Sequence, residues 1–162
     1  MNTVYSNKLK KYLKISVMSE KEAVWYSKKA TQSYQMISIT SKGEATADIK
    51  ESGYLKGILR LQFNDIESDI NGVKAPVKED FIGLKEFIDS WNTGILIVHC
   101  GAGVSRSAGV MAAILEYLQV TDYDIFNDKR HIPNRLVYRL ASQELGIGKG
   151  NEYFENVFKE EE

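Results

Sequence analysis

The sequence has little cysteine, little histidine and almost no net charge, and each shortage excludes a class of protein. The single cysteine, Cys100, cannot form an internal disulfide, so a disulfide scaffold is excluded and a reducing compartment is expected. The two histidines, His99 and His131, are too few and too far apart for a typical zinc site, and we expect no metal or cofactor. A formal net charge of -1 gives no bulk electrostatic reason to expect binding to nucleic acid or to anionic membranes.

Long hydrophobic runs are also missing. No apolar run approaches the roughly 20 residues that a membrane-spanning helix needs, and residues 1–14 lack the apolar core of a signal peptide. We therefore expect a cytoplasmic protein. The chain has 162 residues, of which 43% are hydrophobic and 27% charged, which suits one globular domain and is too short for two. We predict a single domain over residues 1–162 that is a monomer.

The pattern of apolar residues predicts alternating strands and helices. Short apolar runs predict strands at 15–18, 34–39, 57–63 and 95–98. Helical spacing and capping signals predict helices from residue 20, at 79–91, at 108–118 and at 133–145, with shorter ones at 121–126 and 151–158. This alternation predicts an α/β fold: a mainly parallel sheet of about four to five strands with helices on both faces.

Three further expectations belong to particular segments. The four lysines in residues 1–14 indicate a solvated face around Leu9 and Leu13, with a basic patch for a membrane or a partner as the alternative. Asn71-Gly72 predicts a turn. In the helix at 79–91, a stripe of apolar residues is expected to face the core: Ile82, Leu84, Phe87, Ile88 and Trp91.

The segment HCGAGVSRS joins the strand at 95–98 to the helix at 108–118. A loop that leaves a buried strand and enters a helix carries unpaired backbone N–H groups at the positive end of the helix dipole, which favours an oxyanion. Cys100 supplies a nucleophile whose reactive thiolate form is favoured by that environment. Arg106 can hold two phosphoryl oxygens through its planar fork. Ser107 places a hydroxyl where it can assist departure of the thiolate.

This segment resembles the HCxxGxxRS signature of the cysteine-dependent protein tyrosine phosphatases. With the cysteine given, chance agreement at the other four positions is on the order of one in 10^5 by composition. The resemblance implies a phosphatase fold and hydrolysis through a phosphocysteine on Cys100. It also implies that a phosphate binds in the loop formed by Gly101, Ala102, Gly103, Val104, Ser105 and Arg106. The chain's length resembles the compact dual-specificity group.

A phosphatase of this kind needs a general acid for the leaving group. The resemblance implies an Asp some thirty-odd residues before the cysteine, after a strand. Asp65 lies 35 positions upstream (100 − 65) and follows the predicted strand directly, so we favour it over Asp69, which lies 31 upstream (100 − 69). Either aspartate could instead be a loop-capping residue.

Other residues receive weaker assignments. His99 ends the strand, and we expect it to orient the loop and to favour the thiolate; His131 is expected to be a surface or loop residue. Pro133-Asn134 resembles the start of a later helix in the dual-specificity group, but the glutamine expected after it is replaced by Arg139 or Leu140. Arg135 and Arg139 could recognise substrate charge or could pair with surface acids.

The sequence thus predicts a phosphatase acting on phosphotyrosine in proteins or peptides, with phosphoserine and phosphothreonine as further substrates. The loop has no lysine, which the resemblance associates with lipid substrates, so a phosphoinositide is disfavoured. A module that only binds phosphorylated partners is one alternative, but it needs no nucleophilic thiol. An arsenate reductase or sulfur transferase is another; the first normally requires further thiols and the second needs no upstream Asp.

Overall fold

The computed structural model describes residues 1–122, 126 and 131–147 and contains one five-stranded sheet. The strands are β1 (Asn2–Ser6), β2 (Lys11–Ser19), β3 (Tyr34–Thr40), β4 (Leu55–Gln62) and β5 (Ile95–Cys100). Their spatial order is β1-β2-β5-β3-β4, and every neighbouring pair is parallel except β1 with β2. The prediction of a mainly parallel sheet in a single α/β domain is therefore confirmed.

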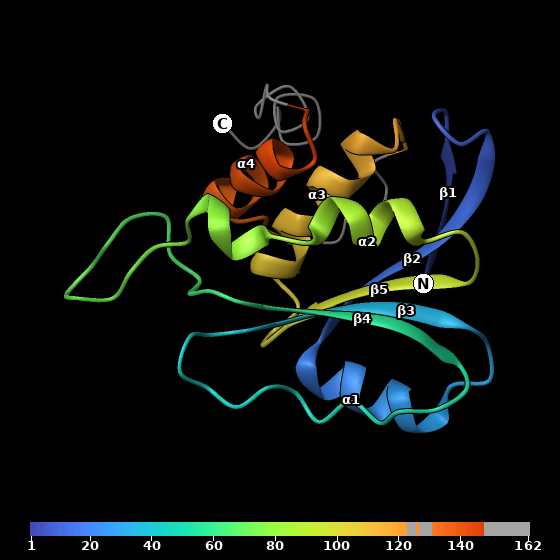
Figure 1. Cartoon of the computed structure of the whole chain (residues 1–162), viewed down its shortest axis with the longest axis horizontal. Helices are drawn as coiled ribbons and strands as arrows, with labels where there is room; N and C mark the ends of the chain where they lie inside the picture. Colours follow the sequence, from blue (N-terminus) through green and yellow to red (C-terminus); the bar gives the residue numbers. More distant parts are fainter. Residues whose placement is uncertain (123–125, 127–130, 148–162) are drawn as a thin grey trace.

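The helices cover both faces of the sheet (Figure 1). They are α1 (Glu20–Lys29), the short 3-10 helix η1 (Lys78–Phe81), α2 (Leu84–Ser90), α3 (Arg106–Tyr117) and α4 (Arg135–Glu144). Figure 1 shows α1 on one face and α2, α3 and α4 on the other. Within the described part of the chain, none of these helices has the length and apolarity needed to cross a membrane.

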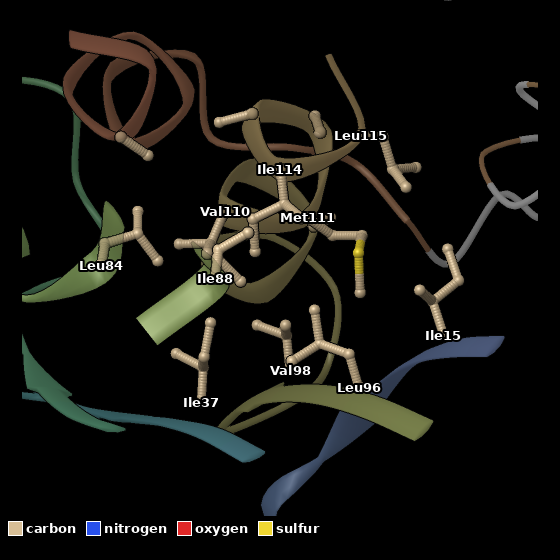
Figure 2. Close-up of a cluster of buried hydrophobic side chains, with 14 of the residues drawn as sticks. Ile15, Ile37, Leu84, Ile88, Leu96, Val98, Val110, Met111, Ile114 and Leu115 are labelled. Atoms are coloured by element: carbon tan, nitrogen blue, oxygen red, sulfur yellow. The ribbon is translucent and has the colours of Figure 1, made fainter. Parts of the chain in front are cut away.

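Strand β5 lies in the middle of the sheet, and both of its faces are covered. All six of its residues are buried, and it pairs with β2 on one side and β3 on the other. Figure 2 shows Leu96 and Val98 of this strand pointing toward Val110, Met111 and other apolar side chains of α3. Complete burial of a side chain of this kind stabilises the fold by roughly 1.5–3 kcal/mol. This packing fixes the end of β5, from which the cysteine loop leaves.

The predicted helix at 79–91 is wrong in its first half. The chain forms η1 over Lys78–Phe81, takes a left-handed conformation at Gly83 (φ 94°) and only then enters α2. Ile82 lies at this break and is 69% exposed, so it does not belong to the core stripe. Trp91 caps the carboxyl end of α2 and is 4% exposed, as a core residue should be.

The first strand was not predicted, because residues 2–6 lack a strong alternating pattern. They form an antiparallel hairpin with β2, in which Leu13 faces the core and Leu9 is exposed. The prediction of a solvated face is therefore wrong for Leu13, although the four lysines are exposed: Lys8, Lys10, Lys11 and Lys14. The capping box of α1, Ser19 with Glu22, is confirmed. So is the turn at Asn71-Gly72, which Ile70 and Val73 close with two backbone hydrogen bonds.

Helix α4 starts later than the sequence predicts. Asn134 caps α4, which begins at Arg135, two residues after Pro133. The chain leaves the helix through Gly146, whose φ is 80°. Residues 123–125 of the helix predicted at 121–126, and the whole of the helix predicted at 151–158, lie outside the described residues.

Candidate active site

The carboxyl ends of three neighbouring parallel strands meet at one edge of the sheet. Ser19 ends β2, Thr40 ends β3 and Cys100 ends β5. Residues 101–105 form the loop between β5 and α3. Ligands of open parallel sheets bind at this edge, because loops and the amino ends of helices converge there. The cysteine motif lies where the fold class places ligand sites.

Gly103 holds the loop against the end of β2. Its φ of 71° lies in the left-handed region, which glycine adopts without strain. A Cβ atom at this position would lie 2.5 Å from the backbone nitrogen of Ser19, closer than real contacts allow. The backbone N–H of Glu20 also donates to the Gly101 carbonyl over 3.0 Å. The loop is thus held in a curled conformation by the neighbouring strand and helix.

The loop presents backbone donors. Among the residues that the structure describes, none accepts a hydrogen bond from the backbone N–H groups of residues 102–105. Ser105 precedes α3, but its hydroxyl makes no capping bond to that helix and donates to Asp65 instead. The positive end of the α3 dipole is therefore not offset by a side-chain cap, and an anion in the loop would be stabilised there.

Arg106 is held by one nitrogen of its guanidinium. Nη1 donates to the hydroxyl of Ser41 over 2.9 Å and to the carbonyl of Phe63 over 3.1 Å, at the ends of β3 and β4. Nη2 lies 3.3 Å from where a Cβ on Gly101 would be, so the group reaches over the start of the loop. Nε is buried, and no described residue accepts from Nε or Nη2. The edge formed by these two nitrogens is the one that can bind an oxyanion with two hydrogen bonds.

Cys100 and Ser107 meet beneath the loop. The Sγ atom of Cys100 lies 3.1 Å from the Oγ atom of Ser107, within hydrogen-bond distance. Both side chains are buried, Cys100 at 2% exposure and Ser107 at 0%. A hydroxyl in this position can donate to a thiolate and stabilise its charge.

His99 has no ring nitrogen free for a substrate. Nδ1 lies 3.2 Å from the carbonyl of Cys100, which can only accept, so Nδ1 carries the hydrogen. Nε2 then accepts from the hydroxyl of Ser38 over 2.6 Å. Burial lowers the pKa of His99, and the charges of Arg60 and Arg106 lower it further, although the hydrogen bond to Cys100 opposes them. The ring is therefore neutral. Its two hydrogen bonds link Ser38 of β3 to the backbone carbonyl of Cys100.

The two candidate acids have different surroundings. Asp65 is exposed and its Oδ1 accepts from Ser105 Oγ at 2.9 Å and from Asn134 Nδ2 at 3.0 Å. Asp69 instead accepts from the backbone N–H of Ala75 at 2.8 Å and from Lys74 Nζ at 3.3 Å. These bonds lower the pKa of Asp69, the one from Ala75 most. The structure thus brings Asp65 to the cysteine loop, while Asp69 stabilises its own turn.

A groove of about 590 Å³ borders the loop on the side of Asp65. Its lining is mixed, with apolar, acidic and basic side chains: Asp65, Ile66, Glu67, Ser68, Ile70, Ser105, Ile132, Pro133, Asn134 and Arg135. Arg135 lies on this lining, whereas Arg139 is exposed on α4. His131 borders a smaller pocket of about 60 Å³ with Ala102, Gly103 and Val104, so it lies nearer to the loop than a general surface assignment implies.

The sequence patterns missed the residues that hold the catalytic candidates. Ser41 was assigned no role, and Ser38 was interpreted only as part of the strand predicted at 34–39. Asn134 was noted as a helix start without a role toward Asp65. The one usable signal was topological, since polar residues directly after parallel strands gather at one edge of the sheet.

The chain was compared with known protein families, curated proteins and solved structures. No family model matches the chain, and no match was found among the curated proteins. Among solved structures, the chain is similar to the crystal structure of the human tyrosine phosphatase-like serine/threonine/tyrosine-interacting protein. The identity is 23%, the alignment covers 81% of this chain and 86% of that chain, and the TM-score is 0.49.

Proposed function

We propose that the protein is a cysteine-dependent phosphatase that hydrolyses phosphomonoesters through a phosphocysteine on Cys100. In the first step the Cys100 thiolate attacks phosphorus, so that a sulfur–phosphorus bond forms while the bond to the leaving oxygen breaks. Asp65, as the carboxylic acid, donates its proton to that oxygen and becomes a carboxylate. Arg106 and the backbone N–H groups of residues 101–105 bind the remaining phosphoryl oxygens.

The second step returns the enzyme to its starting state. The Asp65 carboxylate takes a proton from a water molecule, whose oxygen attacks the phosphorus of the phosphocysteine. The sulfur–phosphorus bond breaks, inorganic phosphate leaves, and Cys100 is again a thiolate. Ser107 Oγ, 3.1 Å from the sulfur, stabilises the thiolate as it leaves. Every proton is accounted for by Asp65 and water, and the positive field of Arg106 removes the need for a metal ion.

The arrangement of Arg106 carries the proposal. Its Nη1 is used by Ser41 and Phe63, and the edge formed by Nε and Nη2 is left without an acceptor in the described structure. A buried guanidinium nitrogen without a partner is costly unless a ligand supplies the acceptor. A phosphoryl group in the loop would supply two oxygens at that edge.

The substrate we propose is phosphotyrosine in a protein or peptide, with phosphoserine and phosphothreonine as further substrates. The exposed groove beside Asp65 supports a polymer substrate, because it leaves room for residues adjacent to the phosphorylated one. The absence of lysine from residues 101–105 disfavours a polyphosphorylated lipid headgroup.

The proposal is tested by hydrolysis of an aryl phosphate in the presence of a metal chelator. We expect turnover by the wild type and none by Cys100→Ser, because a serine hydroxyl in this loop is not ionised. Turnover that needs an added metal would contradict the proposal. Absence of turnover, with binding of a phosphopeptide retained, would indicate a binding module instead.

A further inference from the structure

The amino end of α4 is bonded to both segments that form the candidate site. Asn134, which is 5% exposed, donates from its backbone N–H to the Ser105 carbonyl over 3.0 Å. Its side-chain Nδ2 donates to Asp65 Oδ1 over 3.0 Å and lies 3.4 Å from the carbonyl of Ile66. One residue therefore contacts the loop that follows Cys100 and the segment that carries the proposed acid.

The orientation of the Asn134 amide is fixed by the helix it caps. Its Oδ1 accepts from the backbone N–H of Val137 over 3.0 Å, the usual bond of a helix cap. An amide has one acceptor end and one donor end, so the donor end must face Asp65 and Ile66. A flipped amide would lose the cap and would place an oxygen against two other oxygens.

Two neighbouring bonds strengthen this link. Ser105 Oγ donates to the same Oδ1 of Asp65, over 2.9 Å. Glu67 Oε1 accepts from the backbone N–H of Arg135 over 2.8 Å, which attaches the acid segment to α4 a second time. Among the described residues, no group donates to Oδ2 of Asp65, so this second oxygen is left to carry a proton.

We infer that Asn134 is a positioning residue for the general acid of the proposed reaction, and that Ser105 assists it. The inference rests on the proposed function. By holding Oδ1 with two donors, the pair fixes the carboxyl group and leaves Oδ2 to deliver the proton to the leaving oxygen. The acid is then held near the loop before a substrate binds, and its placement requires no ordering of the segment during the reaction.

Two substitutions separate this role from the capping of α4. Asn134→Ser and Asn134→Asp both keep a side chain that can cap α4, so neither should lower the urea midpoint of unfolding through loss of the cap. Serine removes the donor to Asp65. Aspartate replaces that donor with a carboxylate oxygen facing Asp65 and the Ile66 carbonyl, which repel it. We therefore expect the kcat of Asn134→Asp to be lower than that of Asn134→Ser.

The readout is kcat with two aryl phosphates, phenyl phosphate and 2,4-dinitrophenyl phosphate. Phenol leaves poorly and needs the proton of Asp65, whereas dinitrophenol leaves without it. For phenyl phosphate we expect kcat to fall roughly 10- to 100-fold in Asn134→Ser, the scale of a misplaced catalytic group. For dinitrophenyl phosphate it should stay near wild type. In an Asp65→Asn background, the serine substitution should cause no further loss.

Each other outcome counts against the inference. Equal losses with both substrates, or an additive loss in the double variant, would show that Asn134 supports the site without acting through Asp65. Wild-type kinetics in Asn134→Asp would show that only the cap matters. An inactive wild type would overturn the proposed function, and the inference with it, whereas an active wild type with an unaffected Asn134→Ser would overturn the inference alone.

Discussion

The guanidinium of Arg106 serves both the fold and the candidate site: Nη1 is bonded within the fold, and Nε and Nη2 are left for a ligand. Its place six residues after Cys100 made it predictable from the sequence. Its acceptors, Ser41 and the Phe63 carbonyl, lie 65 and 43 residues away in the chain, and no local pattern links them to it. These contacts arise because β3 and β4 end at the same edge of the sheet as β5. The residue could therefore be proposed from the sequence, but its orientation could not be predicted.

His99 should make the stability of the fold depend on pH. Burial lowers its pKa below the ordinary value of 6.5, so below that pH the unfolded chain binds a proton that the folded chain does not. The free energy of unfolding should be independent of this group above about pH 7 and should fall as the pH drops from about 6.5 to 5. Urea unfolding of the wild type across this range measures the slope.

Two variants test whether that slope belongs to His99. His99→Gln removes the titrating ring, and the slope between about pH 6.5 and 5 should become shallower. His131→Gln removes the other histidine of the sequence, and a slope that is lost in this variant but kept in His99→Gln would contradict the assignment. A His99→Gln protein with the full wild-type slope would show that another group is responsible.

At the scale of elements, the local pattern of apolar residues was sufficient to predict an element that packs against the core along its whole length. The apolar run of β5 and the helical spacing of α3 predicted both elements and the loop between them. The helix predicted at 79–91 failed because a periodic pattern does not show the left-handed residue at Gly83 that interrupts it. Strand β1 was missed because an edge strand needs only one buried face, so its apolar signal is weak, whereas part of β2 was predicted at 15–18.

The contact between the cysteine loop and β2 predicts a specific loss of stability. Gly103→Ala adds a Cβ 2.5 Å from the Ser19 nitrogen at a φ of 71°, so both strain and overlap destabilise the loop. We expect unfolding free energy to fall by about 3 kcal/mol or more. Gly43 is a matched control, because its φ is 82° but its Cβ would meet no atom within 4 Å. Gly43→Ala should cost only about 1 kcal/mol, the strain alone.

Chemical denaturation of the two variants measures this difference, and phosphatase activity at a temperature where both are folded gives a second readout. Gly103→Ala should lose activity while Gly43→Ala keeps it, because only the first displaces the loop. Equal destabilisation by the two substitutions would show that the loop can move away from β2 without cost.

At the scale of the whole molecule, the fold class followed from the alternation of strands and helices, but the spatial order of the strands did not. The order β1-β2-β5-β3-β4 depends on pairings between residues far apart in the chain. The same holds for the site: the spacing of 35 residues indicated Asp65, while its bond to Asn134 spans 69 residues and is visible only in three dimensions. The residues proposed to carry the chemistry could be named from the sequence, and the residues that hold them could not.

The central claim is that Cys100 becomes covalently phosphorylated during turnover. The most direct measurement is a rapid denaturing quench of the enzyme during hydrolysis of an aryl phosphate, followed by mass spectrometry of the peptide that contains Cys100. With dinitrophenyl phosphate, Asp65→Asn should make the phosphocysteine accumulate. The first step does not need the acid because dinitrophenol leaves without a proton, whereas the attack of water in the second step has lost its base. We expect phosphate on Cys100 in that variant and none in Cys100→Ser. Hydrolysis of the aryl phosphate without phosphate on Cys100, in both the wild type and Asp65→Asn, would contradict the account.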